Sequence, residues 1–304
     1  MEPFRVHILG CGSALPTLRH SASSQVVEVR DKLLMLDCAE GTQMQLRRCK
    51  VRFTKLSHVF ITHLHGDHCF GLIGMISTFG LLGRTAKLHV HAPRELESIL
   101  DSQIRFFTHD LGFEVVFHSV DTQNSDIIYE DKSIVVETIP LQHRMPTCGY
   151  LIREKQGLPH IRREMIDFYK VPTSQINNIK NGADWITPEG EIISNARLVK
   201  PAEPARCYAY CSDTRYIPLL HQQLKGVTTL YHESTYGEDN IKQAEKYYHS
   251  TARQAAMVAR DAGVEKLLLG HYSSRYGDET ILLDEAKKIF KNTFLTNEMD
   301  VFDV

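Results

Sequence analysis

Residues 63–68 place four potential metal ligands directly after an apolar segment, and this motif restricts the possible folds more than any other feature. The preceding residues, 57–62, are typical of a strand, so two histidines that lie two residues apart point to the same side. Gly66 permits the tight turn that brings the next two ligands round. Imidazole and carboxylate groups together suit Zn²⁺ or a similar ion. We therefore predict a metal site, with a surface histidine cluster as the alternative, and the ligands would be His63, His65, Asp67 and His68.

Three later segments that are typical of strands, residues 133–141, 207–211 and 266–269, are each followed closely by a histidine or an aspartate. The carboxyl ends of strands are where α/β proteins collect their chemistry. Taken singly, each residue has a structural explanation, as a helix cap or a loop residue. Because the motif at 63–68 cannot saturate two metals by itself, we interpret all three as further ligands: His143, Asp213 and His271.

Short strands and helices alternate along most of the chain, which predicts stacked α/β layers. The expected strands are at 4–9, 25–29, 33–36, 57–62, 88–91, 133–141, 149–152, 207–211, 229–232 and 266–269, and the expected helices at about 42–48, 69–82, 93–105, 218–224, 251–262 and 279–290.

The amino-acid composition changes over residues 153–204, which contain five prolines, several asparagines and the chain's only tryptophan, Trp185. Hydrophobic periodicity is weak there except around 161–169 and 174–179. Basic and acidic side chains are interleaved along the segment, as in a solvated excursion. We therefore predict a single domain over 1–304, with residues 153–200 inserted as a protruding arm.

Composition excludes several classes of protein. The 304 residues are 42% hydrophobic and 24% charged, as in an ordinary globular chain, and no apolar stretch approaches the length of a membrane span. The formal net charge of −2 provides no global field for nucleic acid, so any such partner must bind local basic patches. The seven cysteines are odd in number and form no CxxC pair, which favours reduced thiols and a cytoplasmic location.

Taken together, the motifs resemble those of the metallo-β-lactamase superfamily and, more closely, of the short form of the ribonuclease Z family, the tRNA 3′-processing endonucleases. The histidine motif alone would indicate only the superfamily. The His-Ser-Thr-Ala run at 249–252, the His-Glu-Ser-Thr run at 232–235 and the insertion after Tyr150 make the resemblance specific. The other matching segments are 9–17, 37–43, His143 with 149–150, 212–214 and 270–276.

This resemblance implies a four-layer αβ/βα sandwich with two zinc ions per subunit. Two ions about 3.5–4 Å apart can share one hydroxide, which attacks phosphorus in line, and can clamp a phosphodiester oxygen. The substrate would be precursor tRNA, and cleavage would remove the 3′ trailer and leave a 3′-hydroxyl on the tRNA. By analogy, His63, His65 and His143 would hold one ion, Asp67, His68 and His271 the other, and Asp213 would bridge them.

The resemblance also assigns the proton transfers. Asp67 would serve as the base for the attacking water, and His249, oriented by Glu233, would protonate the leaving oxygen. The alternative for this pair is a capped helix, in which Ser250 or Thr251 caps the run from Ala252 and His249 merely precedes it.

The insertion falls where the family carries its tRNA-gripping arm. This chain departs from the family at residues 170–174, where a Gly-Pro element is common, and at His20, where an asparagine commonly follows the arginine. Phosphate contacts position a nucleic acid without reading its sequence. The candidate substrate contacts are Arg19 near the 3′ end, and Arg162, Arg163, Lys170 and Lys180 on the arm.

Two other hypotheses stay open from the sequence. A phosphodiesterase of the same fold acting on small substrates would share every ligand and lack only the arm and the His-Ser-Thr element. A non-catalytic RNA-binding protein would have lost a ligand. Tyr247 and Tyr248 could stack on a base or could simply pack. The family resemblance further implies a homodimer, and no membrane partner is expected.

Overall fold

The computed structural model describes residues 2–15, 17–52, 55–108 and 111–304, so Pro16 of the predicted glycine-rich start lies outside the described residues. The chain divides into two compact units. The first comprises Met1–Glu130, Val135–Arg153 and Arg206–Val304, and the second comprises Asp131–Ile134 and Glu154–Ala205.

Within the described residues, the first unit holds two seven-stranded mixed sheets. The first sheet has the order β18 (Val301–Asp303), β1 (Phe4–Gly10), β2 (Ser24–Val29), β3 (Lys32–Leu36), β4 (Leu56–Phe60), β5 (Leu88–Ala92) and β6 (Val115–Ser119). The second has the order β17 (Thr293–Leu295), β16 (Lys266–Gly270), β15 (Thr229–Glu233), β14 (Cys207–Cys211), β9 (Cys148–Glu154), β8 (Ile134–Pro140) and β7 (Ile127–Glu130).

In each sheet the parallel strands lie together. Strands β3 to β6 run parallel to one another, as do β14 to β17, so within each group the carboxyl ends share one edge. A tight hairpin, β2 to β3, precedes the parallel strands of the first sheet, and in it Val29 pairs with Lys32. Arg30 takes a φ of 55°, the left-handed conformation that such turns require at a central position. The strands expected at 25–29 and 33–36 therefore pair as a hairpin.

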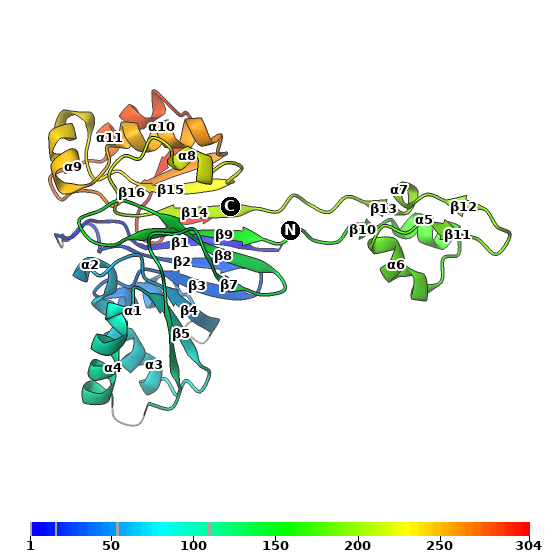
Figure 1. Cartoon of the computed structure of the whole chain (residues 1–304), viewed down its shortest axis with the longest axis horizontal. Helices are drawn as coiled ribbons and strands as arrows, with labels where there is room; N and C mark the ends of the chain where they lie inside the picture. The colour runs from blue at the N-terminus through cyan, green and yellow to red at the C-terminus, as the bar shows by residue number, and fades with distance from the viewer. Residues whose placement is uncertain (1, 16, 53–54, 109–110) are drawn as a thin grey trace. The chain divides into compact units, whose positions relative to one another are not determined.

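Helices cover the outer face of each sheet (Figure 1). Beside the first sheet, Val59 and Val90 pack with Met75 and Leu100 in one buried apolar cluster. The helices on this side are α1 (Thr42–Arg48), α2 (Gly66–Cys69), α3 (Gly71–Leu81) and α4 (Glu95–Phe107). Those on the other side are α8 (Leu220–Gln223), the 3₁₀ turn η3 (Glu238–Asn240), α9 (Ile241–Tyr247), α10 (Ala252–Ala262) and α11 (Thr280–Lys287).

Buried tyrosines connect the inner faces of the two sheets. Tyr150 donates its hydroxyl to the Ile61 carbonyl at 2.6 Å, and Tyr210 donates to the Asp37 carboxylate at 2.9 Å. Both tyrosines are fully buried, so each hydroxyl needs the partner it finds on the opposite sheet. The predicted four-layer sandwich of the metallo-β-lactamase fold is confirmed by this arrangement of two sheets and two helix layers.

The second unit has a small apolar core of its own. Ile166, Ile179, Ile193 and Leu198 are buried together, and Trp185 packs against them. Its elements are β10 (His160–Ile161), α5 (Arg163–Phe168), η2 (Thr173–Gln175), α6 (Ile176–Lys180), β11 (Trp185–Ile186), β12 (Ile192–Ile193), α7 (Asn195–Leu198) and β13 (Val199–Lys200). Elements this short show little hydrophobic periodicity. The sequence therefore predicted a solvent-exposed insertion without its individual helices and strands.

Candidate metal centre

All seven predicted ligands lie at one edge of the sandwich. The motif at 63–68 follows β4 and runs into α2, while Asp213 and His271 follow β14 and β16. His143 lies on the connection between β8 and β9. Because these strands present the same edge, residues separated by up to about two hundred positions meet there. The structure brings their ligand atoms into two groups.

The first group consists of His63, His65, His143 and Asp213. Nδ1 of His65 lies 3.0 Å from Nε2 of His63 and 3.2 Å from Nε2 of His143. Asp213 completes the group from the other sheet, with Oδ2 3.8 Å from Nε2 of both His63 and His143. Three imidazoles and one carboxylate are a familiar ligand set for zinc.

The second group consists of Asp67, His68 and His271. Nε2 of His68 lies 3.3 Å from Oδ2 of Asp67, and Nε2 of His271 lies 3.8 Å from the same oxygen. The other oxygen of Asp213, Oδ1, lies 3.3 Å from His68 and 3.1 Å from His271. The two carboxylate oxygens of Asp213 therefore face different groups, which is the orientation that a bridging ligand needs.

Two buried ring nitrogens support occupation of this centre by a cation. Nε2 of His68 and Nε2 of His271 are inaccessible to solvent, and neither has a hydrogen-bond partner among the described residues. An orphaned polar atom is costly in a buried site, and a metal ion would satisfy both. Burial alone would raise the pKa of Asp213, but the imidazoles of His271 and His68 outweigh it and hold that pKa well below its usual range. The residues therefore fit a cation.

Asp37 orients two of the ligands from the end of β3. Its Oδ2 accepts a hydrogen bond of 2.8 Å from Nδ1 of His68. Its carboxylate also accepts the Thr62 hydroxyl at 3.0 Å, and Oγ1 of Thr62 in turn lies 3.0 Å from Nδ1 of His63. A carboxylate behind a ligating histidine fixes the ring and its tautomer. Asp37 lies in one of the matching segments, 37–43, but this role was not predicted, although an aspartate directly after a buried strand is a usable signal.

Glu233 plays the corresponding part at the end of β15. Its Oε1 accepts a hydrogen bond of 2.8 Å from Nδ1 of His249. Its other oxygen accepts from the Thr235 hydroxyl, and Oγ1 of Thr235 lies 2.8 Å from Nδ1 of His271. Each sheet thus supplies one buried carboxylate that orients two imidazoles, one directly and one through a threonine.

Two residues of the centre have a strained backbone conformation. Asp37 and His271 both adopt φ values in the left-handed region, 55° and 59°, which non-glycine residues rarely occupy. Each stands directly after a buried strand, where the chain must turn sharply to aim its side chain into the centre. Such strain persists where surrounding contacts fix the backbone, as they do here through hydrogen bonds to both side chains.

His249 lies at the centre and also directly before a capped helix. Thr251 caps α10 in a reciprocal capping box with Gln254, so the structural alternative for this segment is real. The same backbone delivers His249 into the centre, where it groups with Asp213 and His271. Burial lowers its pKa, but the neighbouring Glu233 carboxylate outweighs burial and raises the pKa of His249 to about 9. A raised pKa favours the protonated ring, which is the form that can donate a proton.

Five of the seven predicted ligands line an open pocket of about 430 Å³: His65, Asp67, His143, Asp213 and His271. The rest of its lining includes Ser13, Leu15, Arg144, Tyr236 and Tyr247. The Arg144 guanidinium lies 4.6 Å from the centre of the Tyr247 ring. The pocket therefore combines imidazole and carboxylate side chains with aromatic side chains and one guanidinium.

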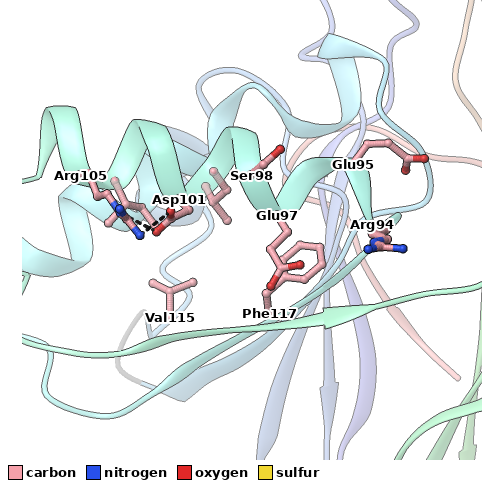
Figure 2. Close-up of a pocket in the computed structure, with 10 residues that line it drawn as sticks. Arg94, Glu95, Glu97, Ser98, Asp101, Arg105, Val115 and Phe117 are labelled. Carbon is pink, nitrogen blue, oxygen red and sulfur yellow. Dashed lines mark hydrogen bonds and ion pairs between the residues drawn. The ribbon is translucent and has the colours of Figure 1, made fainter.

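A larger hollow of about 820 Å³ lies elsewhere, between α4 and β6 (Figure 2). Glu97 and Phe117 line it, and Arg105 makes an ion pair with Asp101 one turn away on the same helix. Acidic and basic side chains are mixed along its wall, and no group of potential metal ligands among the described residues falls there. We therefore place the candidate centre at the histidine pocket.

The predicted substrate contacts have different surroundings. The guanidinium of Arg19 donates to the Tyr276 carbonyl at 3.2 Å and forms an ion pair with Glu279, so it holds a neighbouring turn. Arg162 is half-buried and donates to the Val199 carbonyl at 3.0 Å. Exposed or half-exposed charges on the second unit are provided by Arg163, Lys170 and Lys180.

Comparison with known proteins identifies the family. The chain is 57% identical over 298 residues to ribonuclease Z of Bacteroides fragilis (strain YCH46), covering 98% of each chain. It is 44% identical over 304 residues to ribonuclease Z of Azobacteroides pseudotrichonymphae, covering 100% of each. The chain belongs to the ribonuclease Z family. The prediction that it is a ribonuclease Z enzyme is confirmed by these full-length relatives.

Solved structures and a family model extend this result. Human tRNase Z, short form, has a TM-score of 0.72 at 23% identity and covers 98% of both chains, while YhfI of Bacillus subtilis has a TM-score of 0.69 at 17% identity and covers 100% of both. These likenesses establish the fold that ribonuclease Z proteins share. Residues 4–158 also match the family model for anti-Pycsar protein Apyc1, so this half of the chain belongs to that family too. No helix in the described part of the chain is long and apolar enough to cross a membrane.

Proposed function

We propose that this protein is a zinc-dependent endoribonuclease that removes the 3′ trailer from precursor tRNA and leaves a 3′-hydroxyl on the tRNA. The observation that carries the proposal is Asp213, whose two oxygens face two separate groups of imidazole and carboxylate ligands. Full-length similarity to proteins named ribonuclease Z supports the substrate class.

Two zinc ions are the cofactors we propose. His63, His65 and His143 would hold one, Asp67, His68 and His271 the other, and Asp213 would contact both. The mixture of imidazole and carboxylate ligands, without a thiolate, suits zinc. When bound, the ions would supply Lewis-acid charge at the phosphoryl oxygens and lower the pKa of water.

Asp67 and His249 would carry the two proton transfers. The Asp67 carboxylate lines the pocket and its pKa lies below the usual range, because the neighbouring imidazoles of His271 and His68 outweigh burial. An ionised carboxylate at this position can accept the proton of the attacking water. His249 would donate a proton to the departing 3′-oxygen of the tRNA, with Glu233 holding the ring in place, and the phosphate would stay on the trailer.

The second unit would bind the body of the tRNA, as the family resemblance implies for the inserted segment. Arg163 and Lys170 are exposed, and Lys180 ends α6. These side chains can contact phosphates at any sequence. Arg162 has a partly structural role through Val199, so its share of the phosphate contacts would be smaller.

Tyr247 would stack on a base next to the cleavage point. It lines the pocket and is backed by Arg144 at 4.6 Å and by Lys246 at 5.3 Å from the ring centre. An aromatic face with adjacent cations is the usual platform for a single-stranded nucleotide. This supports stacking over the packing alternative for Tyr247, whereas Tyr248 contributes its carbonyl to Nδ1 of His143.

We also propose a cytoplasmic homodimer. Four large apolar side chains are exposed at the carboxyl-terminal ends of α3 and α4: Leu81, Leu82, Phe106 and Phe107. An exposed apolar group of this kind supports a protein interface. No disulfide forms among the described cysteines, which suits a reducing compartment. Light scattering should give twice the chain mass, and a monomer would refute the dimer.

A phosphodiesterase acting on small substrates is the second candidate. The match of residues 4–158 to the Apyc1 model favours it, because that half of the chain carries five of the seven ligands and is shared with a differently named family. Both candidates would use the same centre. They differ in whether the rest of the chain selects tRNA.

The test is cleavage of a 3′-extended precursor tRNA by zinc-loaded protein, with the cut mapped and a small chromogenic phosphodiester assayed in parallel. A single cut beside the discriminator base or the CCA end is expected. Turnover of the small diester without tRNA cleavage would transfer the function to the second candidate. An Asp101→Ala protein, altered only in an exposed carboxylate on α4, serves as the preparation control.

A further inference from the structure

Three potential metal ligands meet at a second place, between the end of β1 and the segment that joins β17 to β18. They are Cys11, His20 and Glu298, and their ligand atoms all lie within 4.8 Å of one another. Sγ of Cys11 lies 3.2 Å from Nδ1 of His20 and 3.7 Å from Oε1 of Glu298. Nδ1 of His20 lies 3.0 Å from Oε2 of Glu298.

We propose that Cys11, His20 and Glu298 form a further binding site for a zinc-class divalent cation, separate from the candidate centre. Zinc bonds of about 2.3 Å to sulfur and about 2.0–2.2 Å to nitrogen or oxygen, at tetrahedral angles, separate ligand atoms by about 3.3–3.6 Å. The observed separations of 3.2, 3.7 and 3.0 Å lie close to this range. Thiolate, imidazole and carboxylate are all zinc ligands, and three protein ligands leave a fourth position open.

Glu279 occupies the position of an outer-sphere partner. Its Oε1 lies 3.5 Å from Nε2 of His20, the ring nitrogen that faces away from Cys11. Ligating histidines commonly give their second nitrogen to a carboxylate. Arg19 in turn pairs with Glu279 and balances its charge. This arrangement gives His20, which stands where an asparagine is common in the family, a specific use.

Burial supports a cation at this place. The Cys11 side chain is fully buried, and His20 and Glu298 have side chains only 10% and 15% exposed. Burial and the neighbouring Glu298 carboxylate raise the pKa of the Cys11 thiol well above its usual range, so the site without metal is a hydrogen-bonded thiol. A bound cation would displace that proton, which makes occupancy dependent on deprotonation.

The site would fix a loop that borders the candidate centre. Cys11 and His20 stand at the two ends of the segment that includes Ser13 and Leu15, both of which line the centre's pocket. Glu298 lies far away in sequence, on the carboxyl-terminal segment. A cation bound by all three would cross-link that segment to the loop.

Cobalt substitution tests the site, because only a sulfur ligand gives a thiolate-to-cobalt charge-transfer band in the near ultraviolet. The predicted ligands of the candidate centre include no sulfur. Protein loaded with Co²⁺ should therefore show this band, and Cys11→Ser should remove it. The Cys11→Ser protein should also bind one equivalent of metal fewer, as measured by elemental analysis. These readouts do not depend on nuclease activity, so the proposed function and this site can fail separately.

Matched variants exclude other thiols and misfolding. Cys69 donates its thiol to the His65 carbonyl at 3.4 Å, so it is the cysteine next to the candidate centre, and Cys69→Ser should retain the band. If Cys11→Ser does not fold, His20→Asn and Glu298→Gln should each weaken the band and lower the metal content. Absence of the band from the loaded wild-type protein, or its persistence in Cys11→Ser, would overturn the proposal.

Discussion

The two units of this molecule hold their functional side chains in different ways. In the first unit buried carboxylates orient the imidazoles of the candidate centre, as Asp37 does for His68 and Glu233 for His249. In the second unit the candidate contact Arg163 is exposed and pairs with Asp167 one turn away on the same helix. The first unit therefore holds its functional side chains in a fixed geometry, whereas the second unit presents exposed charged side chains. Substitutions should therefore separate chemistry from tRNA binding.

The largest effect should come from Asp67→Ala, which removes a predicted ligand and the proposed base. Cleavage of precursor tRNA and of a small phosphodiester should both fall below detection, because both need the same centre. Activity assays on both substrates, with metal content measured in parallel, check this prediction. The exposed Asp101→Ala should keep full activity. Retained turnover in Asp67→Ala would break the two-ion arrangement.

Loss of the proposed proton donor should discriminate between leaving groups. In His249→Ala, tRNA cleavage should fall by about 10²–10⁴-fold, the usual contribution of a general acid. A diester with a nitrophenolate leaving group needs little protonation and should lose much less. Single-turnover rates on both substrates measure the ratio, with His221→Ala as a control away from the pocket. Equal losses on both substrates would remove His249 from the role of donor.

Replacing residues 155–198 with a short flexible linker should separate the two units' roles. The kcat/KM for tRNA should fall by about 10²-fold, equivalent to about 2.7 kcal/mol of binding free energy. Hydrolysis of the small diester should stay within about twofold, because the remaining first unit contains every ligand. If tRNA cleavage survives at full rate, the second unit does not bind the substrate.

The smallest expected effect concerns individual charges. Arg163→Ala combined with Lys170→Ala should raise KM for tRNA a fewfold and leave kcat unchanged. The slope of log binding against log salt should fall by about one for each phosphate that the variant no longer neutralises. Lys287→Ala with Lys288→Ala, at the end of α11, provides a control of equal charge change. If both double variants change KM and the salt slope equally, Arg163 and Lys170 make no particular contact with the tRNA.

Much of the fold could be predicted because its signals are local. The apolar runs that became β4, β14 and β16 are short and strongly patterned, and each is followed by a polar side chain. Strands β6, β7, β17 and β18 and helix α9 were not predicted from the sequence. The final strand, β18, pairs with β1 from the opposite end of the chain. No local sequence pattern indicates such a distant partner.

The sequence by itself determined the chemistry of the candidate site: which imidazoles and carboxylates are available, and that they follow strands. Only the tertiary structure decided how they are used. The orientation of Asp213 toward two groups, the support of His68 by Asp37, and the meeting of Cys11 with Glu298 all join residues that lie far apart in the chain. Hydrogen bonds and ligand distances of this kind depend on how the two sheets pack, because side-chain directions are fixed only when both inner faces are buried.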